Sequence, residues 1–425
     1  MEKVRGLRWW IIGMIAAATV INYIDRTSLA IMWPDISKEM DITKEQYATI
    51  VSAFMIAYAI GQALSGKLFD WVGTRLGFVL SITVWSLSCA LLSVARGVAS
   101  FSFFRGMLGL SEAGNWPGGV KASAEWFPVS ERALAAGIFN AGASLGAVIS
   151  APLIATLYLL VGWKATFIIV GLLGIIWVIP WWVLSRSEPS EHPWLTEEER
   201  QYILTGQKIG APAQADTRVP SWGELLTYRK SWSLIVGRFF LDPVWWLFVN
   251  WLPIYLADQF KFDVRQIGFF AWVPYLGAAI GSIVGGWWSG YKIRQGWSVN
   301  KARKWAVAIG GIMMVPAFVL IAFADSPLVA VLLMAFLLAG YQVTMNNILT
   351  LPTDFFSGKS VGSLAGMGGM SAVFGVLVFS TWLIPYLSTV SYVPVFLMGA
   401  MLVPVGTAGL FLLSGVIERV KLHQK

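Results

Sequence analysis

The ten residues GKLFDWVGTR at 66–75 lie between two apolar runs of the chain. The glycines Gly66 and Gly73 let helix ends approach one another closely because they carry no Cβ atom. Asp70 can cap the N-terminus of a helix or pair with a cation. We therefore predict that this loop, in which Arg75 is the last residue, clasps helix ends together and acts as a gate.

The composition of the whole chain suits lipid rather than water. Of its 425 residues 57% are hydrophobic and only 13% are charged, with a mean hydropathy of +0.67, which indicates an integral membrane protein. The first apolar run is too long for a cleaved signal peptide, and no small-residue cleavage site follows it. Twelve apolar runs approach the length of about 20 residues that crosses a bilayer as a helix: 9–33, 47–69, 76–95, 99–120, 133–158, 164–185, 232–256, 268–290, 303–323, 328–350, 362–385 and 391–416.

The positions of lysine and arginine predict the orientation of these spans. If the N-terminus is cytoplasmic, 22 of the 31 basic residues lie on the cytoplasmic side, 6 on the other side and 3 within the membrane. This bias favours a cytoplasmic location for both termini. The net charge of +8 is thus a signal of topology. It does not indicate nucleic-acid binding, because no soluble domain is present to gather the charge on one face.

A polar stretch at 186–230 divides the chain into a six-helix bundle at 1–185 and another at 231–425. Within this cytoplasmic linker, Thr196 and Glu199 have the spacing of a capping box for a short helix. The Gly/Ala/Pro stretch at 210–213 is typical of a flexible connection.

The two bundles also share residues at constant offsets. Gly61 matches Gly281 at an offset of 220, and Gly146 matches Gly375 at an offset of 229, which suggests duplication. Two such halves, related about an axis normal to the membrane and enclosing a central cavity, are the architecture of alternating-access transporters.

Three of the predicted spans carry an arginine near a carboxylate. A charge at the bilayer centre costs about 2.5–3.5 kcal/mol on insertion scales, so these groups need mutual pairing or a polar cavity. By default they mark the pathway of a charged solute. The three sets are Asp25 with Arg26, Arg105 with Glu112, and Arg238 with Asp242.

Few residues are available for enzymatic or metal chemistry inside the membrane. The single cysteine, Cys89, excludes an internal disulfide and a cysteine metal cluster, and His192 and His423 fall in soluble segments. No nucleophile and base converge, so we do not expect an enzyme or a bound cofactor. Any proton relay in the membrane therefore has to use carboxylates.

The loop at 66–75 resembles the G-x-x-x-D-x-x-G-x-R signature of the major facilitator superfamily, at the same place in the fold. In the second half Gly290 stands where the aspartate would be, so a weaker clasp is expected there. The segments 22–26, 105–113 and 125–132 look like the anion:cation symporter family, and 121–128 and 238–253 are similar to bacterial hexuronate transporters. The resemblance implies a multi-pass, monomeric protein of the bacterial inner membrane that moves organic anions such as sugar acids with protons.

Glu112 is the predicted proton carrier. It shares a helix face with Arg105, seven residues and about 10 Å away along the axis. Gly114 and Pro117 loosen the helix just after Glu112, which allows the carboxylate to change its surroundings, as a proton carrier must. The alternative is a structural hydrogen bond between helices.

Asp25 and Arg26 are adjacent and point about 100° apart, so one of them can face a cavity while the other reaches a neighbouring helix. The resemblance to galactonate-type symporters implies that Asp25 is a second proton site and that Arg26, or else Arg105, holds the substrate carboxylate. Some hexuronate carriers have no acid at the position of Asp25, which leaves its role and the proton stoichiometry open. A permanent ion pair between Asp25 and Arg105 is the alternative.

Arg238 and Asp242 are four residues apart and could simply neutralise each other. Alternatively, Arg238 grips a carboxylate through its bidentate fork and Asp242 accepts sugar hydroxyls. In that case Trp245, Trp246 or Trp251 offers a flat apolar face to the sugar ring. Further polar side chains at membrane depth are candidate hydroxyl readers, with hydrogen bonds between helices as the alternative: Tyr23, Tyr58, Gln62, Asn250, Gln342, Asn346 and Asn347.

We therefore predict an all-α protein with the major facilitator fold, twelve transmembrane helices and cytoplasmic termini. Its predicted function is proton-coupled uptake of a hexuronate such as glucuronate or galacturonate, with the anion and the lipid bilayer as its partners. The alternatives are a carrier of an aldonate such as galactonate or of another organic anion, and a uniporter or exchanger. A membrane sensor would need a signalling domain, for which the polar segments are too short.

Overall fold

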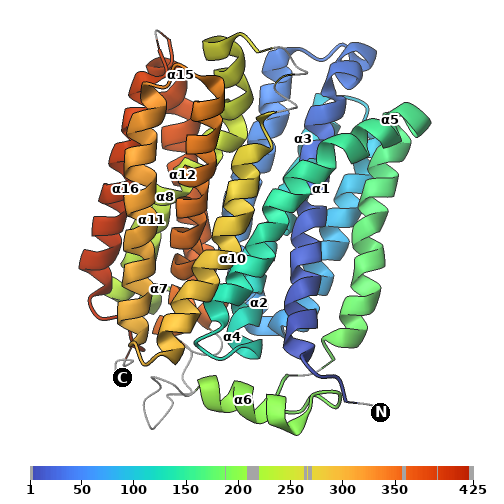
Figure 1. Cartoon of the computed structure of the whole chain (residues 1–425). Helices are drawn as coiled ribbons and strands as arrows, with labels where there is room; N and C mark the ends of the chain where they lie inside the picture. The colour runs from blue at the N-terminus through green and yellow to red at the C-terminus, as the bar shows by residue number, and fades with distance from the viewer. Residues whose placement is uncertain are drawn as a thin grey trace. The chain divides into compact units, whose positions relative to one another are not determined.

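The computed structural model describes residues 3–186, 188–207, 220–262, 266, 270–356, 360–389 and 391–420. This part of the chain is built almost entirely of helices (Figure 1). Within it no strand is formed, and the one isolated β-bridge joins Val4 to Leu195. The prediction of an all-α protein is confirmed.

Nearly all of the predicted runs fall on helices. Nine helical segments in the described ranges are long and apolar enough to cross a membrane, while the count of twelve spans stays a prediction. The elements are α1 (Leu7–Met40), α2 (Lys44–Leu91), η1 (Leu92–Val94), α3 (Val98–Glu112), α4 (Asn115–Trp126), α5 (Arg132–Leu184), α6 (Glu197–Gln207), α7 (Trp222–Leu225), α8 (Arg229–Phe260), α10 (Val273–Arg294), α11 (Val299–Ala322), α12 (Pro327–Ile348), α13 (Leu351–Phe355), α14 (Val361–Val376), the π-helix η3 (Leu377–Leu383), α15 (Ile384–Leu387) and α16 (Val393–Ser414).

The two longest helices each contain two predicted spans because a glycine breaks them. Gly73 in α2 has φ 80° and ψ 170°, and Gly162 in α5 has φ 75° and ψ 170°. Residues with a Cβ atom rarely adopt a positive φ, so these turns favour glycine. The chain changes direction at both points, which separates 47–69 from 76–95 and 133–158 from 164–185.

The contacts divide the chain into two compact units. Unit 1 consists of Met1–Phe127, Gly142–Thr205 and Lys359–Met370, and unit 2 of Pro128–Ala141, Gly206–Gly358 and Ser371–Lys425. Compared with the predicted halves, the start of α5 belongs to unit 2 and the start of α14 belongs to unit 1. The predicted flexible stretch at 210–213 lies outside the described residues.

A close helix contact in unit 1 recurs in unit 2. A Cβ atom on Gly61 of α2 would collide with the carbonyl oxygen of Leu110 in α3, and one on Gly281 of α10 would collide with that of Ala339 in α12. Small residues permit such packing between helices in lipid. The positions differ by 220 for the glycines and by 229 for their partners, so the contact supports the duplication inferred from the same offsets.

The predicted linker helix is present as α6, and its glutamate holds the start of α1. Glu199 accepts hydrogen bonds from the backbone N–H groups of Gly6 (2.8 Å) and Leu7 (3.2 Å), and its ion pair with the Arg8 side chain is 2.6 Å long. Its own N–H donates to the Thr196 hydroxyl (3.3 Å), as the capping box requires. The Glu199 carboxylate, in contrast, binds the N-terminus of α1, where the helix dipole is positive. Figure 1 shows α6 beside the N-terminal segment.

His192, in the same linker, has a defined protonation state. Its ring contacts the Leu184 carbonyl through Nε2 (3.1 Å), and its Nδ1 accepts a hydrogen bond from the Trp194 N–H (3.3 Å). This pair of contacts requires the neutral imidazole. Burial lowers the pKa of His192, and Arg186 and Arg200 act in the same direction. The histidine is therefore a neutral structural group of the linker.

Candidate functional site

Arg26 is the centre of a charged cluster in unit 1. Its Nε donates to Oε2 of Glu112 (3.1 Å), and its NH2 group donates to Oδ1 of Asn22 (3.1 Å). The guanidinium carbon lies 4.7 Å from the centre of the Tyr58 ring and 5.2 Å from that of Tyr23. Charge pairing between helices and cation–π contacts thus hold this arginine in a largely buried position.

Glu112 lies at a break in the predicted fourth span. α3 ends at Glu112 and α4 begins at Asn115, so the run 99–120 forms two helices rather than one. The side chain is fully buried, and its Oε1 atom has no hydrogen-bond partner among the described residues. The break beside Gly114 places this carboxylate where the backbone can adjust, in line with the loosening predicted from the sequence.

Arg105 does not form the ion pair with Asp25 that was one alternative. Its guanidinium donates through Nη1 and Nη2 to the backbone carbonyl of Arg26 (3.3 and 3.4 Å), and its central carbon lies 4.6 Å from the centre of the Phe54 ring. Among the described residues it has no carboxylate within ion-pair distance. The guanidinium of Arg105 thus contacts a carbonyl and an aromatic ring. The alternative of a permanent ion pair with Asp25 is wrong for the structure described.

Asp25 points away from its neighbour Arg26. The residue has no exposed surface, and neither carboxylate oxygen has a well-oriented hydrogen-bond partner in the described part of the chain. The thiol of Cys89, on α2, lies beside it. One of the two adjacent charges therefore enters the cluster around Glu112, while the other faces a neighbouring helix.

The remaining predicted hydroxyl readers of unit 1, Tyr58 and Gln62, both lie on α2. Tyr58 is buried and stacks on Phe54, with ring centres 5.7 Å apart and an angle of 16° between planes. Gln62, four residues later, is also buried, and its Oε1 atom has no hydrogen-bond partner among the described residues. Their role in reading hydroxyl groups stays a prediction.

Arg238 and Asp242 form an ion pair in unit 2. Nη2 of Arg238 lies 2.7 Å from Oδ2 of Asp242, and both residues are buried on α8. One turn further, Trp245 stacks on Tyr341 with ring centres 6.0 Å apart, and it meets Tyr275 edge to face. The structure thus contains the neutralised pair that the spacing of four residues allows.

Two of the predicted hydroxyl readers in unit 2 belong to a hydrogen-bond network between helices. Nδ2 of Asn140 donates to Oε1 of Gln342 (2.5 Å) and to Oδ1 of Asn346 (2.9 Å). Asn346 in turn donates to the backbone carbonyl of Ser282 (2.6 Å). Asn140 is hard to recognise in the sequence because it lies inside an apolar run. An amide at membrane depth is nevertheless a sign of a polar contact.

The other two candidates of unit 2 differ in exposure. Asn347 is fully buried, donates to the carbonyl of Val343 (2.9 Å) and accepts a hydrogen bond from Arg303 (3.4 Å). Asn250 is exposed on α8. Binding of substrate by any of the four amides stays a prediction.

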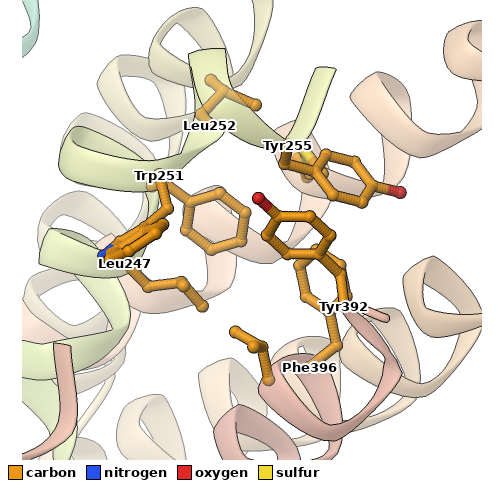
Figure 2. Close-up of a pocket in the computed structure, with 9 residues that line it drawn as sticks. Leu247, Trp251, Leu252, Tyr255, Tyr392 and Phe396 are labelled. Atoms are coloured by element: carbon orange, nitrogen blue, oxygen red, sulfur yellow. The ribbon is translucent and has the colours of Figure 1, made fainter. Parts of the chain in front are cut away.

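A small pocket in unit 2 is apolar. Figure 2 shows Trp251, Tyr255, Tyr392 and Phe396 around it. Trp251 also donates from its indole N–H to the carbonyl of Ser380 (3.1 Å). No charged side chain lines this pocket. It therefore lacks the cation that an organic anion requires.

The predicted clasp is formed within unit 1. The Asp70 carboxylate accepts hydrogen bonds from the backbone N–H groups of Gly362 (3.0 Å) and Ser363 (2.6 Å) and pairs with Lys121 (3.1 Å). It thus caps the first turn of α14 and binds a cation at the same time. A Cβ atom on Gly66 would collide with the carbonyl oxygen of Gly362, so the close approach depends on glycine.

Arg75, the last residue of the motif, contacts the end of α5. It donates to the backbone carbonyls of Trp182 (3.0 Å) and Arg186 (3.1 Å), and its guanidinium carbon lies 3.9 Å from the centre of the Trp182 ring. Three of the four motif residues, Gly66, Asp70 and Arg75, thus have defined contacts, and Gly73 supplies the turn with positive φ. Their gating role stays a prediction.

Glu125 extends the charged contacts around the clasp. Its Oε2 accepts a hydrogen bond from the hydroxyl of Thr74 (2.7 Å), and its Oε1 lies 3.7 Å from the ammonium group of Lys121. A carboxylate is thus held by a threonine 51 residues before it and a lysine four residues before it.

The same arrangement recurs in unit 2, where no sequence motif predicts it. Adding 229 to those three positions gives Arg303, Thr350 and Asp354. Oδ2 of Asp354 accepts from Nε of Arg303 (3.0 Å) and from the hydroxyl of Thr350 (3.3 Å). Cation and threonine have exchanged places about the carboxylate. The second half therefore has a charged contact of its own, although Gly290 lacks the aspartate that the motif predicts.

Arg303 is fully buried, which leads to a prediction about stability. We expect Asp354→Asn to lower the melting temperature by roughly 5 °C or more, because breaking a buried ion pair leaves the remaining charge uncompensated. Glu125→Gln should have a smaller effect, since Lys121 keeps its partner Asp70. Thermal unfolding of the detergent-solubilised protein measures both.

Asp325→Asn is the matched control, because it makes the same aspartate-to-asparagine change at an exposed position. Equal shifts of the melting temperature for Asp354→Asn and Glu125→Gln would contradict the argument that Asp70 still compensates the charge of Lys121.

A helical chain with arginine–carboxylate pairs inside its apolar spans has the features typical of a membrane transport protein. The family model of the Major Facilitator Superfamily matches residues 15–380. The chain belongs to this superfamily. It is thus a multi-pass transporter of the inner membrane and not an enzyme.

Known proteins similar to the chain include carriers of different sugar acids. It is 33% identical over 400 residues to the hexuronate transporter of Escherichia coli (strain K12), covering 93% of this chain and 91% of that protein. It is 29% identical over 391 residues to a probable galactarate/D-glucarate transporter of the same strain, covering 88% and 86%. The crystal structure of the human organic anion transporter MFSD10 superposes with a TM-score of 0.68 at 16% identity, covering 96% and 99%. This last similarity supports the fold.

Proposed function

We propose that the protein imports a sugar acid with one carboxylate, a hexuronate such as glucuronate or galacturonate, together with protons. The observation that carries the proposal is the ion pair between Arg26 and Glu112, buried in unit 1. A guanidinium can hold one carboxylate through its fork, and here a carboxylate of the protein itself occupies the arginine. The sequence similarity to a hexuronate transporter supports a sugar acid as the class of substrate.

Competition for Arg26 couples the proton to the substrate. Protonation of Glu112 removes its charge, so that the guanidinium becomes available for the carboxylate of the substrate. Loss of the proton restores the pair with Glu112 and expels the anion. The rings of Tyr23 and Tyr58 keep the guanidinium in place during the exchange, because their contacts do not depend on the carboxylate.

Arg105 and Asp25 have supporting roles in this proposal. Arg105 donates to the carbonyl of Arg26 and adds positive potential without a carboxylate of its own at ion-pair distance among the described residues. Asp25 is fully buried without a well-oriented hydrogen-bond partner, an environment in which an ionised carboxylate is costly. We therefore assign a second proton to Asp25.

The test is uptake of labelled substrates into proteoliposomes, with and without an imposed pH gradient. We expect accumulation of glucuronate and galacturonate that requires an inward proton gradient and collapses with a protonophore. Galactonate and a dicarboxylate complete the panel. Preference for galactonate would indicate an aldonate carrier. Uptake that does not depend on the pH gradient would indicate a uniporter or exchanger.

A further inference from the structure

The turn between α10 and α11, within unit 2, gathers positive charge at the end of two helices. Lys292, Arg294 and Lys301 lie on or beside this turn, and their side chains are exposed or half-buried. The sequence from 264 to 324 contains no aspartate or glutamate. In the described part of the chain, no carboxylate lies within ion-pair distance of the three cations. Lys292 donates to Oε1 of Gln295 (3.1 Å), a neutral group that leaves its charge uncompensated.

Two of these cations are held on the ring of Trp297. The ammonium nitrogen of Lys301 lies 4.4 Å from the ring centre, and that of Lys292 lies 5.3 Å from it. The ring meets Trp288 edge to face, with ring centres 6.0 Å apart. The turn is fixed as well, because the N–H of Trp297 donates to the carbonyl of Lys292 (3.0 Å) and Gly296 has φ 91°. Two like charges are thus held close together, an arrangement that a bound anion would stabilise.

Both lysines lie where an exposed apolar face of a helix ends. On α11, Trp305 is 50% exposed and lies one turn after Lys301. On α10, Trp287 is 48% exposed and stacks on Tyr291, with ring centres 5.3 Å apart. The ammonium nitrogen of Lys292 lies 5.6 Å from the centre of the Tyr291 ring. Exposed aliphatic side chains continue the two faces away from the turn: Ile280 and Val284 on α10, and Ile312 and Val319 on α11.

We infer that Lys292 and Lys301 bind the headgroup of an anionic phospholipid, whose acyl chains lie along the exposed faces of α10 and α11. A lipid fits better than a soluble anion, because the cations stand at the end of apolar faces and among tryptophan and tyrosine rings, which favour the headgroup level of a membrane. Basic clusters beside membrane spans attract lipids of net negative charge. Orientation of the spans depends on the number of basic residues in a loop and does not require two of them to converge on one ring.

The test measures how phosphatidylglycerol stabilises the purified protein in detergent. The lipid concentration that gives half of the maximal rise in melting temperature reports the apparent affinity. We expect Lys292→Gln and Lys301→Gln each to weaken this affinity about fivefold, because each removes one of the two charges that attract the headgroup. Lys301→Arg keeps the charge and should retain the affinity of wild-type protein. Phosphatidylcholine with the same acyl chains has no net charge and should stabilise the protein less.

Lys304→Gln is the matched control. Lys304 lies three residues after Lys301 on α11, but its ammonium group donates to the backbone carbonyl of Gly415 (2.6 Å). The variant removes the same charge from the same helix without touching the pair on Trp297. Its affinity for phosphatidylglycerol should therefore match that of wild-type protein.

Several outcomes would overturn the inference. Unchanged affinity in either Lys292→Gln or Lys301→Gln would show that the two cations do not act together on the headgroup. An equal loss of affinity in Lys304→Gln would show that the lipid responds to the general charge of the surface. If phosphatidylcholine or free inorganic phosphate stabilises wild-type protein as well as phosphatidylglycerol does, the partner is not an anionic lipid.

Discussion

Glu112→Gln is expected to abolish accumulation of substrate against its gradient while leaving exchange of substrate across the membrane intact. Glutamine can still accept a hydrogen bond from Arg26 through its amide oxygen, but it cannot bind and release a proton. The ion pair that holds Arg26 is also lost, so the substrate carboxylate meets no competing charge. Uptake driven by a pH gradient and counterflow in preloaded proteoliposomes measure the two activities separately.

Glu197→Gln is the control for this experiment, because the carboxylate of Glu197 is exposed in the linker and the chemical change is the same. It should accumulate substrate like wild-type protein. If Glu112→Gln accumulates substrate as strongly as wild-type protein does, Glu112 is not the proton carrier.

Arg26→Lys is expected to lower the initial rate of uptake by about 10-fold or more, since lysine keeps the charge but loses hydrogen bonds to a charged group, each of which contributes about 1.5–3 kcal/mol. The guanidinium reaches Glu112 and Asn22 through separate nitrogen atoms while its plane lies against two aromatic rings. An ammonium group is a point charge without a planar fork, so it cannot reproduce these contacts together. Initial uptake rates over a range of substrate concentrations separate weaker binding from slower transport.

Arg5→Lys is the control for the loss of a guanidinium, because Arg5 is almost fully exposed near the N-terminus. Its uptake should match that of wild-type protein. Near-normal rates in Arg26→Lys would show that the site needs only positive charge at this position and would remove the bidentate contact from the mechanism.

The sequence predicts the helices and the intramembrane charges well, because both follow from local physics. Apolar runs of the length of a membrane span mark the helices, and the cost of burying charge draws attention to Arg26, Glu112 and Arg238. The spacing of four residues also anticipates the pair with Asp242. These inferences need only residues that are close together in the chain.

Contacts between distant segments could not be read in the same way. Asp70 is visible as a capping residue, but its partners Gly362 and Ser363 lie almost 300 residues further along the chain. Arg303 looked like one more positive charge on the cytoplasmic side, and nothing local connects it with Asp354. A sequence shows that a polar group needs a partner, whereas the fold decides which partner it finds.

The exchange of cation and threonine between the two repeats has a consequence for how such proteins diverge. Each repeat needs one positive charge near its carboxylate, Glu125 or Asp354, and the structure meets that need from either of two neighbouring helices. After gene duplication, a cation could therefore move from one helix to the other through compensating substitutions without loss of the fold. Comparison of single positions in the two repeats therefore finds a different residue at each of the two places, although each carboxylate keeps one basic partner.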